Sequence, residues 1–215
     1  MSHLALWAGL GMNRLSEATL EIPGVRITWL IPEPPVAHEP REAWIQRMAK
    51  FIPPDADFIG GFSLGGMLAL EHVPLLPQCR GLLLMSYAAN RNSWRNYLRL
   101  AASSGLLHML LLIPSGILLR MALWFLKIFG RNTHGTMKVA MRAWTPSETV
   151  EVLRFLLKER TKNLSVPILQ VIGTQDPWLR PGPGSTAVTG AGHFFFPKYK
   201  MEISRNISLW IKSLV

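Results

Sequence analysis

Cysteine and aspartate are scarce in this chain of 215 residues, which has a single cysteine, Cys79, and only three aspartates. One cysteine cannot close a disulfide within the chain or supply the thiolates of a cysteine metal cluster. The sequence also lacks a glycine-rich phosphate loop with lysine, paired histidines at zinc spacing, and a carboxylate pair suited to glycoside chemistry. No basic segment precedes the first apolar residues, so we expect no signal peptide and a cytoplasmic location.

Positive charge is in excess, with a net charge of +10. Thirteen basic and three acidic residues lie between positions 80 and 162, and the remainder of the chain is balanced. Such a segment is typical of a solvated helical face, and it also suits contact with anionic lipid or an acidic substrate. We do not predict nucleic-acid binding, because charge alone would support it and no recognisable module is present.

The outer thirds of the chain alternate between β-prone apolar runs and helix-length segments. Strands separated by helices imply crossover connections and a parallel sheet covered on both faces. We therefore predict an α/β fold with a mainly parallel sheet of about six strands. The predicted strands are 4–8, 25–31, 57–62, 81–85, 167–172 and 185–189, and the predicted helices include 40–51, 66–71 and 201–214.

A G-x-S-x-G motif with Ser63 at its centre occupies residues 61–65, between the β-prone stretch 58–60 and the helix-prone stretch 66–71. Glycines on both sides allow a sharp turn that lifts a serine out of the sheet. The following helix N-terminus offers free N–H groups to a developing oxyanion. This context favours a nucleophilic serine over a tight structural turn.

Such a serine needs a histidine base, and the base is usually oriented by a carboxylate. Asp55 and Asp57 precede the serine strand and so lie at the wrong end of the sheet. Asp176 follows the strand 167–172 and is itself followed by Pro177. Because active sites in parallel sheets form at the carboxyl ends of strands, Asp176 is the predicted acid.

His193, within Gly-Ala-Gly-His just past the last predicted strand, is the predicted base among the six histidines. The resulting chain order is Ser63, Asp176, His193, which is the order of α/β-hydrolases. Glu148 and Glu151 remain remote alternatives for the acid.

At these motifs the chain resembles the α/β-hydrolase superfamily, over about 135 residues in two blocks. The elbow is similar to that of small carboxylesterases, which read Gly-(Trp/Phe)-Ser-Leu-Gly-Gly. The resemblance implies that one oxyanion donor is the N–H of Leu64 and that the other is the N–H of Leu10. It also implies a core of residues 1–86 and 165–215, with a helical cap inserted at 87–164.

The chain departs from the pattern of this family at three places. Ala8 stands where the family usually has the histidine of a His-Gly-X loop, a residue that usually supports this loop. The two strands that usually precede the first one here are lacking. Only residues 177–184 separate the loop of Asp176 from the last predicted strand, where the family often has a helix.

The predicted cap is strongly apolar within 100–126. One interpretation is a lid that roofs an acyl-binding pocket, and a second is a lid that also rests on a membrane, because Arg120 and Lys127 flank apolar residues. A transmembrane helix is a weaker third, since a Pro-Ser-Gly break interrupts the segment. The resemblance implies a substrate pocket, for which the candidate residues are Gly9, Phe62, Trp124 and Phe194.

The sequence predicts a serine esterase that acts on an ester or thioester with an apolar acyl group and needs no metal or organic cofactor. The same three residues would also serve carbon–carbon bond hydrolysis, acyl transfer or a lyase step. A non-catalytic protein that uses the basic cap for contact with a membrane or a partner is a further alternative. A homo-oligomer through the sheet edge or the cap also fits the pattern.

Overall fold

The computed structural model describes residues 1–10, 12, 20–89, 93–96, 100, 114, 117, 144–157, 164–193 and 198–215. Most of the predicted cap lies outside these ranges, so its boundaries and its role remain predictions.

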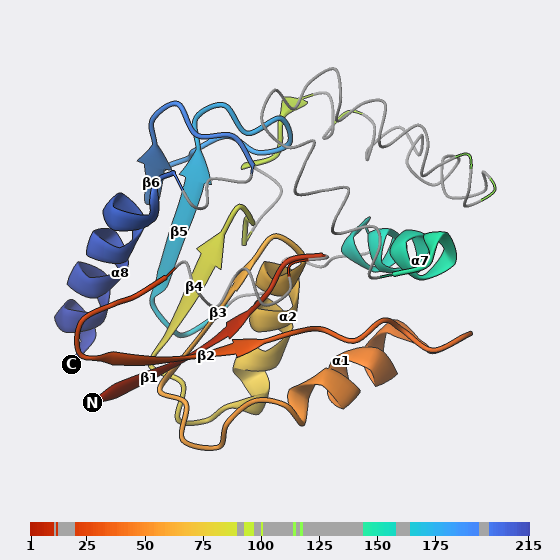
Figure 1. The fold of residues 1–215 in the computed structure, drawn as a ribbon, viewed down its shortest axis with the longest axis horizontal. Coiled ribbons are helices and arrows are strands. Elements are labelled where there is room, and N and C mark those ends of the chain that lie inside the picture. Colours follow the sequence, from red (N-terminus) through yellow and green to blue (C-terminus); the bar gives the residue numbers. More distant parts are fainter. Residues whose placement is uncertain are drawn as a thin grey trace.

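Six strands form one sheet in the order β2-β1-β3-β4-β5-β6, and every neighbouring pair is parallel (Figure 1). The predicted mainly parallel sheet of six strands is therefore confirmed, with ends that differ from the prediction by at most two residues. The strands are β1 (Ser2–Trp7), β2 (Val25–Leu30), β3 (Phe58–Phe62), β4 (Gly81–Met85), β5 (Ile168–Gly173) and β6 (Ser185–Val188).

Helices cover both faces of the sheet. In Figure 1, α8 (Lys200–Leu214) lies on one side, and α1 (Arg41–Ala49), α2 (Leu64–His72) and α7 (Pro146–Leu157) lie on the other. A short 3-10 helix, η1 (Val73–Leu75), follows α2 directly.

Alternation along the strands divides the apolar residues between two cores, because successive side chains of a strand point to opposite faces. In β1, Ala5 and Trp7 join the core under α1 and α2, whereas Leu4 and Leu6 join the core under α8. The central strands β3 and β4 are buried throughout, which explains why they appear as continuous apolar runs.

The amphipathic pattern predicted for the C-terminal helix is confirmed. Ile203, Ile207 and Ile211 recur every four residues in α8 and are all buried against the sheet. Trp210 packs beside them with its ring 5.6 Å from that of Phe58. This contact holds α8 against the central strand β3.

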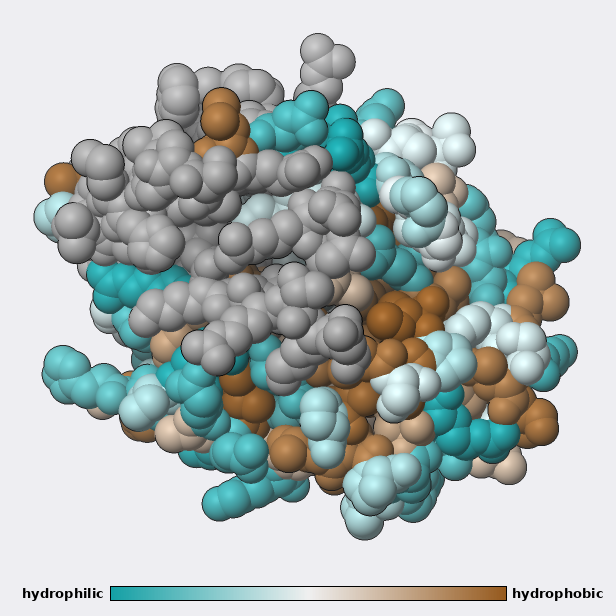
Figure 2. All heavy atoms as spheres, turned by 180° about the vertical axis from the view of Figure 1, so that it is seen from behind, coloured by the Kyte–Doolittle hydropathy of each residue, from teal (hydrophilic) through white to brown (hydrophobic). Residues whose placement is uncertain are grey.

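Figure 2 shows the opposite side of the molecule, where hydrophobic residues are interspersed among hydrophilic ones on the described surface. None of the helices in the described ranges combines the length and the apolar character that a bilayer-crossing segment needs.

Since every strand runs in the same direction, all carboxyl ends meet at one edge of the sheet. The loops after β1, β3, β4, β5 and β6 therefore gather there, and these loops contain the residues predicted from the sequence.

Candidate active site

Ser63 lies at the sharp turn between β3 and α2, with φ 51° and ψ −114°. Its main-chain N–H donates to the carbonyl of Met85 at 2.8 Å, which ties the turn to β4. A Cβ at Gly61 would lie 2.0 Å from the main chain of Gly65, and a Cβ at Gly65 would lie 2.2 Å from the carbonyl oxygen of Trp7. Only glycine fits at these two positions, so the strained turn at the serine requires both.

Asp176 lies in the turn that follows β5, and it is fully buried. One carboxylate oxygen, Oδ1, accepts hydrogen bonds from the main-chain N–H groups of Trp178 (2.8 Å) and Leu179 (3.0 Å). These two donors fix the orientation of the carboxylate and leave its other oxygen, Oδ2, facing His193.

His193 lies between the other two side chains after β6. Its Nδ1 is 2.8 Å from Asp176 Oδ2, and its Nε2 is 2.9 Å from Ser63 Oγ. A carboxylate accepts only, so Nδ1 carries the proton and Nε2 accepts from the serine hydroxyl. The structure thus brings together the three side chains predicted from the sequence. In this arrangement the ring can take a proton from Ser63 while Asp176 holds it in the required tautomer.

Aromatic rings hold the imidazole in place. The ring of Trp178 lies 4.3 Å from that of His193 between centroids, and the ring of Phe62 lies 5.8 Å away, both edge to face. Phe62 is fully buried and packs in the core under α8. Its predicted part in a substrate pocket stays a prediction, and its observed contact is with the base.

The predicted oxyanion donor Leu10 lies in the loop after β1, next to Gly9. The other predicted donor, Leu64, directly follows Ser63 at the start of α2. Gly9 is packed against the residue before the serine, since a Cβ on it would lie 2.9 Å from Phe62 Cδ1. Neither Leu64 nor Leu10 donates its main-chain N–H to an acceptor in the described part of the chain. Both N–H groups therefore remain candidates for binding a negative oxygen. The predicted pocket residues Trp124 and Phe194 lie outside the described residues.

Two contacts at the site were missed from the sequence, and both involve residues after β4. The hydroxyl of Ser86, a buried residue with φ 48°, donates to the main-chain carbonyl of His193 at 2.5 Å. The side chain of Arg95 donates to main-chain carbonyls of the turn that carries Asp176. The position of Ser86 directly after a buried strand was a usable signal, because site residues gather at strand ends, whereas Arg95 had none.

In the part of the chain that the structure describes, neither Cys79 nor a set of metal-ligating side chains forms an alternative centre. Burial raises the pKa of the Cys79 thiol, which donates to the carbonyl of Gly81 at 3.4 Å. Thiols with a raised pKa are poor nucleophiles at neutral pH. Within the described ranges, no three histidine, cysteine or acidic side chains are grouped so that they could hold a metal ion.

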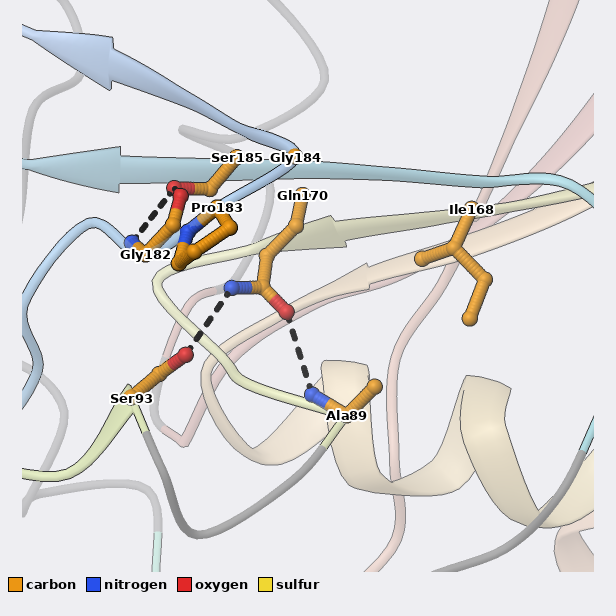
Figure 3. Close-up of a pocket in the computed structure, with 8 residues that line it drawn as sticks. All are labelled: Ala89, Ser93, Ile168, Gln170, Gly182, Pro183, Gly184 and Ser185. Carbon is orange, nitrogen blue, oxygen red and sulfur yellow. Dashed lines mark hydrogen bonds between the residues drawn. The ribbon is translucent and has the colours of Figure 1, made fainter.

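A cavity of about 360 Å³ lies beside β5 (Figure 3). The amide of Gln170 points across it, with Oε1 accepting from the N–H of Ala89 (3.2 Å) and Nε2 donating to Ser93 Oγ (3.4 Å). None of the three side chains lines the cavity, so we do not interpret it as the acyl pocket. Its lining residues are Ala89, Ser93, Ile168, Gln170, Gly182, Pro183, Gly184 and Ser185.

Compared by sequence, the chain matches no family model and no curated protein. Solved structures are similar over nearly its whole length. The esterase RhEst1 from Rhodococcus sp. ECU1013 is 15% identical with a TM-score of 0.60, covering 100% of this chain and 91% of the other. The N-acyl homoserine lactonase AidH is 15% identical with a TM-score of 0.61, covering 100% and 90%.

A third similar structure is the bottromycin epimerase BotH, which is 14% identical with a TM-score of 0.60 and covers 100% of this chain and 91% of the other. At such identities the similarity is one of fold, and proteins named for different reactions share it. The reaction must therefore be argued from the site itself.

Proposed function

The chain has the α/β-hydrolase fold, and we propose that it is a serine hydrolase that cleaves an ester or thioester with an apolar acyl group. The observation that carries this proposal is the continuous contact from Ser63 Oγ through His193 to Asp176, at distances of 2.9 and 2.8 Å. Two similar structures are named as an esterase and a lactonase, which supports a hydrolytic reaction on this fold.

His193 acts as the general base in this mechanism. Its Nε2 takes the proton of Ser63 as Oγ attacks the substrate carbonyl, and the ring becomes an imidazolium. Asp176 accepts from Nδ1 throughout, which leaves Nε2 free to take the serine proton and then stabilises the imidazolium. Trp178 restricts rotation of the ring, because its indole lies 4.3 Å from the imidazole.

The negative oxygen of the tetrahedral intermediate is bound by the N–H groups of Leu64 and Leu10. The first belongs to the N-terminus of α2, where the helix dipole also favours negative charge. The second lies on the loop that Gly9 brings against Phe62. Their lack of other acceptors in the described part of the chain supports this role.

The intermediate collapses when His193 gives its proton to the leaving alcohol or thiol, and the acyl group stays on Ser63. Water then attacks the acyl-enzyme while the same nitrogen takes its proton, and the carboxylic acid leaves. No step needs a metal or an organic cofactor. The preference for an apolar acyl group rests on the apolar sequence of the predicted cap within 100–126.

A second reaction on the same three residues is the alternative, since an epimerase among the similar structures shows that this fold is not confined to hydrolysis. Carbon–carbon bond hydrolysis, acyl transfer or a lyase step would use the same base. These reactions differ from ester hydrolysis in whether an acyl-enzyme forms and, where it forms, in which molecule accepts the acyl group.

Labelling with a fluorophosphonate probe tests the proposal, since the probe reacts with an activated serine. The native chain should be labelled, Ser63→Ala should not, and Ser213→Ala should label like the native chain. Ser213 is a matched control because its exposed hydroxyl bonds to the carbonyl of Trp210 in α8, away from the site. A panel of 4-nitrophenyl esters of increasing chain length should then give a burst of one equivalent of nitrophenol.

Failure of the folded native chain to label, or equal labelling of Ser63→Ala, would reject the serine-hydrolase proposal and favour a non-catalytic role. Labelling without turnover of any ester would favour a different reaction on the same residues.

A further inference from the structure

The segment 93–95, which lies near the start of the predicted cap, runs along the turn that carries Asp176. Trp94 and Leu179 form an isolated antiparallel bridge. The N–H of Arg95 donates to the carbonyl of Trp178 (2.9 Å), and the N–H of Arg180 donates to the carbonyl of Ser93 (2.8 Å). Two parts of the chain that are more than 80 residues apart are thus joined through their main chains.

The side chain of Arg95 adds a second set of contacts to the same turn. Its Nε donates to the carbonyls of Asp176 (3.1 Å) and Leu179 (3.0 Å), and its Nη2 donates to those of Asp176 (2.8 Å) and Thr174 (3.3 Å). A guanidinium holds its donors in a rigid planar fork, so it can contact several carbonyls in one geometry. A lysine ammonium lacks this planar arrangement.

We propose that Arg95 is a positioning residue for the reaction, and that it acts by holding the main chain of Asp176 in the place where its carboxylate meets His193. This inference rests on the proposed function. Arg95 contacts the carbonyl oxygens of the turn, and the described contacts do not join it to Ser63 or to the imidazole. Its effect therefore passes through Asp176.

Other bonds keep the turn folded without Arg95. The N–H of Asp176 donates to the carbonyl of Gly173 (3.1 Å), and that of Gln175 donates to the carbonyl of Ala191 (2.8 Å). The Asp176 carboxylate also binds two N–H groups within its own turn. Loss of Arg95 should leave the turn intact but free to shift, and a shift of about 1 Å can cost about 100-fold in rate.

Steady-state kinetics on an ester of the panel test this role. Arg95→Ala should lower kcat by about 10- to 100-fold with little change in KM, because substrate contacts are untouched. Arg95→Lys should recover only part of the loss. Arg80→Ala is the matched control, since Arg80 also donates to a main-chain carbonyl, that of Leu214, but precedes β4 at the other end of the sheet.

A double-mutant cycle with Asp176→Asn separates positioning from a structural role. If Arg95 acts through Asp176, Arg95→Ala should cost almost nothing more in the Asp176→Asn background, measured as the rate of fluorophosphonate labelling. Ethylguanidinium should also restore part of the kcat of Arg95→Ala while the melting temperature, Tm, stays the same.

An equal loss in both backgrounds, or a loss that tracks a fall in Tm, would overturn the positioning role. Unchanged kcat in Arg95→Ala, with Ser63-dependent labelling intact, would reject this inference and leave the proposed function standing. Absence of Ser63-dependent labelling in the native chain would reject both.

Discussion

Two histidines in this molecule each lie between a hydroxyl and a carboxylate, at opposite ends of the sheet. At the carboxyl ends, His193 contacts Ser63 Oγ (2.9 Å) and Asp176 Oδ2 (2.8 Å). At the amino ends, His3 contacts Thr28 Oγ1 (2.8 Å) and Asp55 Oδ1 (3.1 Å). Both imidazole side chains are 4% exposed, so burial of the ring does not distinguish the two groups.

The carboxylates of the two groups differ. The Asp176 side chain is fully buried, whereas that of Asp55 is 61% exposed and pairs with Arg26. Arg26 Nη2 also lies 2.7 Å from His3 Nδ1. A guanidinium can only donate and a carboxylate can only accept, so the two partners of His3 Nδ1, Arg26 and Asp55, require opposite tautomers of the ring. Asp55 therefore does not fix one tautomer of His3, whereas Asp176 holds the proton of His193 on Nδ1.

The hydroxyls differ as well. Thr28 lies within the regular strand β2, paired with Ala5. Ser63 lies at a strained turn, with a helix N-terminus directly behind it. Contact between a hydroxyl, an imidazole and a carboxylate therefore does not by itself make a catalytic group. Whether such a group can catalyse a reaction also depends on a defined imidazole tautomer, on burial of the carboxylate and on nearby donors for a negative oxygen.

Replacing each of the two histidines with alanine, in separate variants, should give the largest difference in kcat. His193→Ala should lower kcat for an ester by about 10⁵- to 10⁶-fold, because Ser63 loses its base. His3→Ala should leave kcat within about twofold and instead lower the free energy of unfolding by about 1–3 kcal/mol, because buried hydrogen bonds are lost. Ester hydrolysis and urea unfolding measure the two effects. A large loss of kcat in His3→Ala that is not explained by unfolding would contradict the structural role assigned to His3.

The two carboxylates should differ next most strongly. Asp176→Asn should lower kcat by about 10⁴-fold, because the amide favours the wrong tautomer of His193. Asp55→Asn should leave kcat unchanged. Stopped-flow measurement of the acylation burst would check both, with the Tm of each variant as the control for folding. Similar kinetics in the two variants would contradict the assigned acid.

Glycines at the two ends of the sheet should differ in stability. Gly61→Ala should cost about 3–5 kcal/mol, because its Cβ would lie 2.0 Å from the main chain of Gly65. Gly24→Ala, just before β2, should cost only about 1 kcal/mol, since φ is 78° but no atom lies within 4 Å of the new Cβ. Urea unfolding followed by tryptophan fluorescence gives both values, and equal costs would argue against the tight turn at Ser63.

The smallest effect should be the pH dependence of the exposed carboxylate. Desolvation raises the pKa of Asp55, but the hydrogen bond and charge of Arg26 outweigh it and hold that pKa below its ordinary value. Ionised Asp55 therefore stabilises the fold above about pH 4, and this contribution is lost as pH falls through its lowered pKa. Asp55→Asn should lower Tm at pH 7 by no more than about 2 °C, and the difference should shrink at acidic pH. A Tm difference that grows on acidification would contradict this assignment.

Much of the fold was predictable because its signals are local. β4 is buried on both faces and so appears in the sequence as an uninterrupted apolar run. The turn at Ser63 was predictable from the flanking glycines, because its geometry requires them. The scarcity of aspartate left Asp176 as the one aspartate beyond a strand end, and the parallel direction of the sheet placed it near His193.

The supporting contacts were not predictable, because they depend on distant parts of the chain. Nothing near Arg95 in the sequence indicates that its side chain will meet carbonyls of the turn at 174–179. The contact of His3 with Thr28 and Asp55 likewise arises only when three strands are paired. Such contacts require the register of the sheet, which a single sequence does not provide.

The strand order also sets when the site can exist. Ser63 and His193 are 130 residues apart, and β4 and β5 must pair before the loops after β5 and β6 can reach the serine. During synthesis the serine therefore emerges long before its base, and a serine without a base is a poor nucleophile. Under the proposed function, a growing chain is therefore expected to be inert towards esters until β6 is in place.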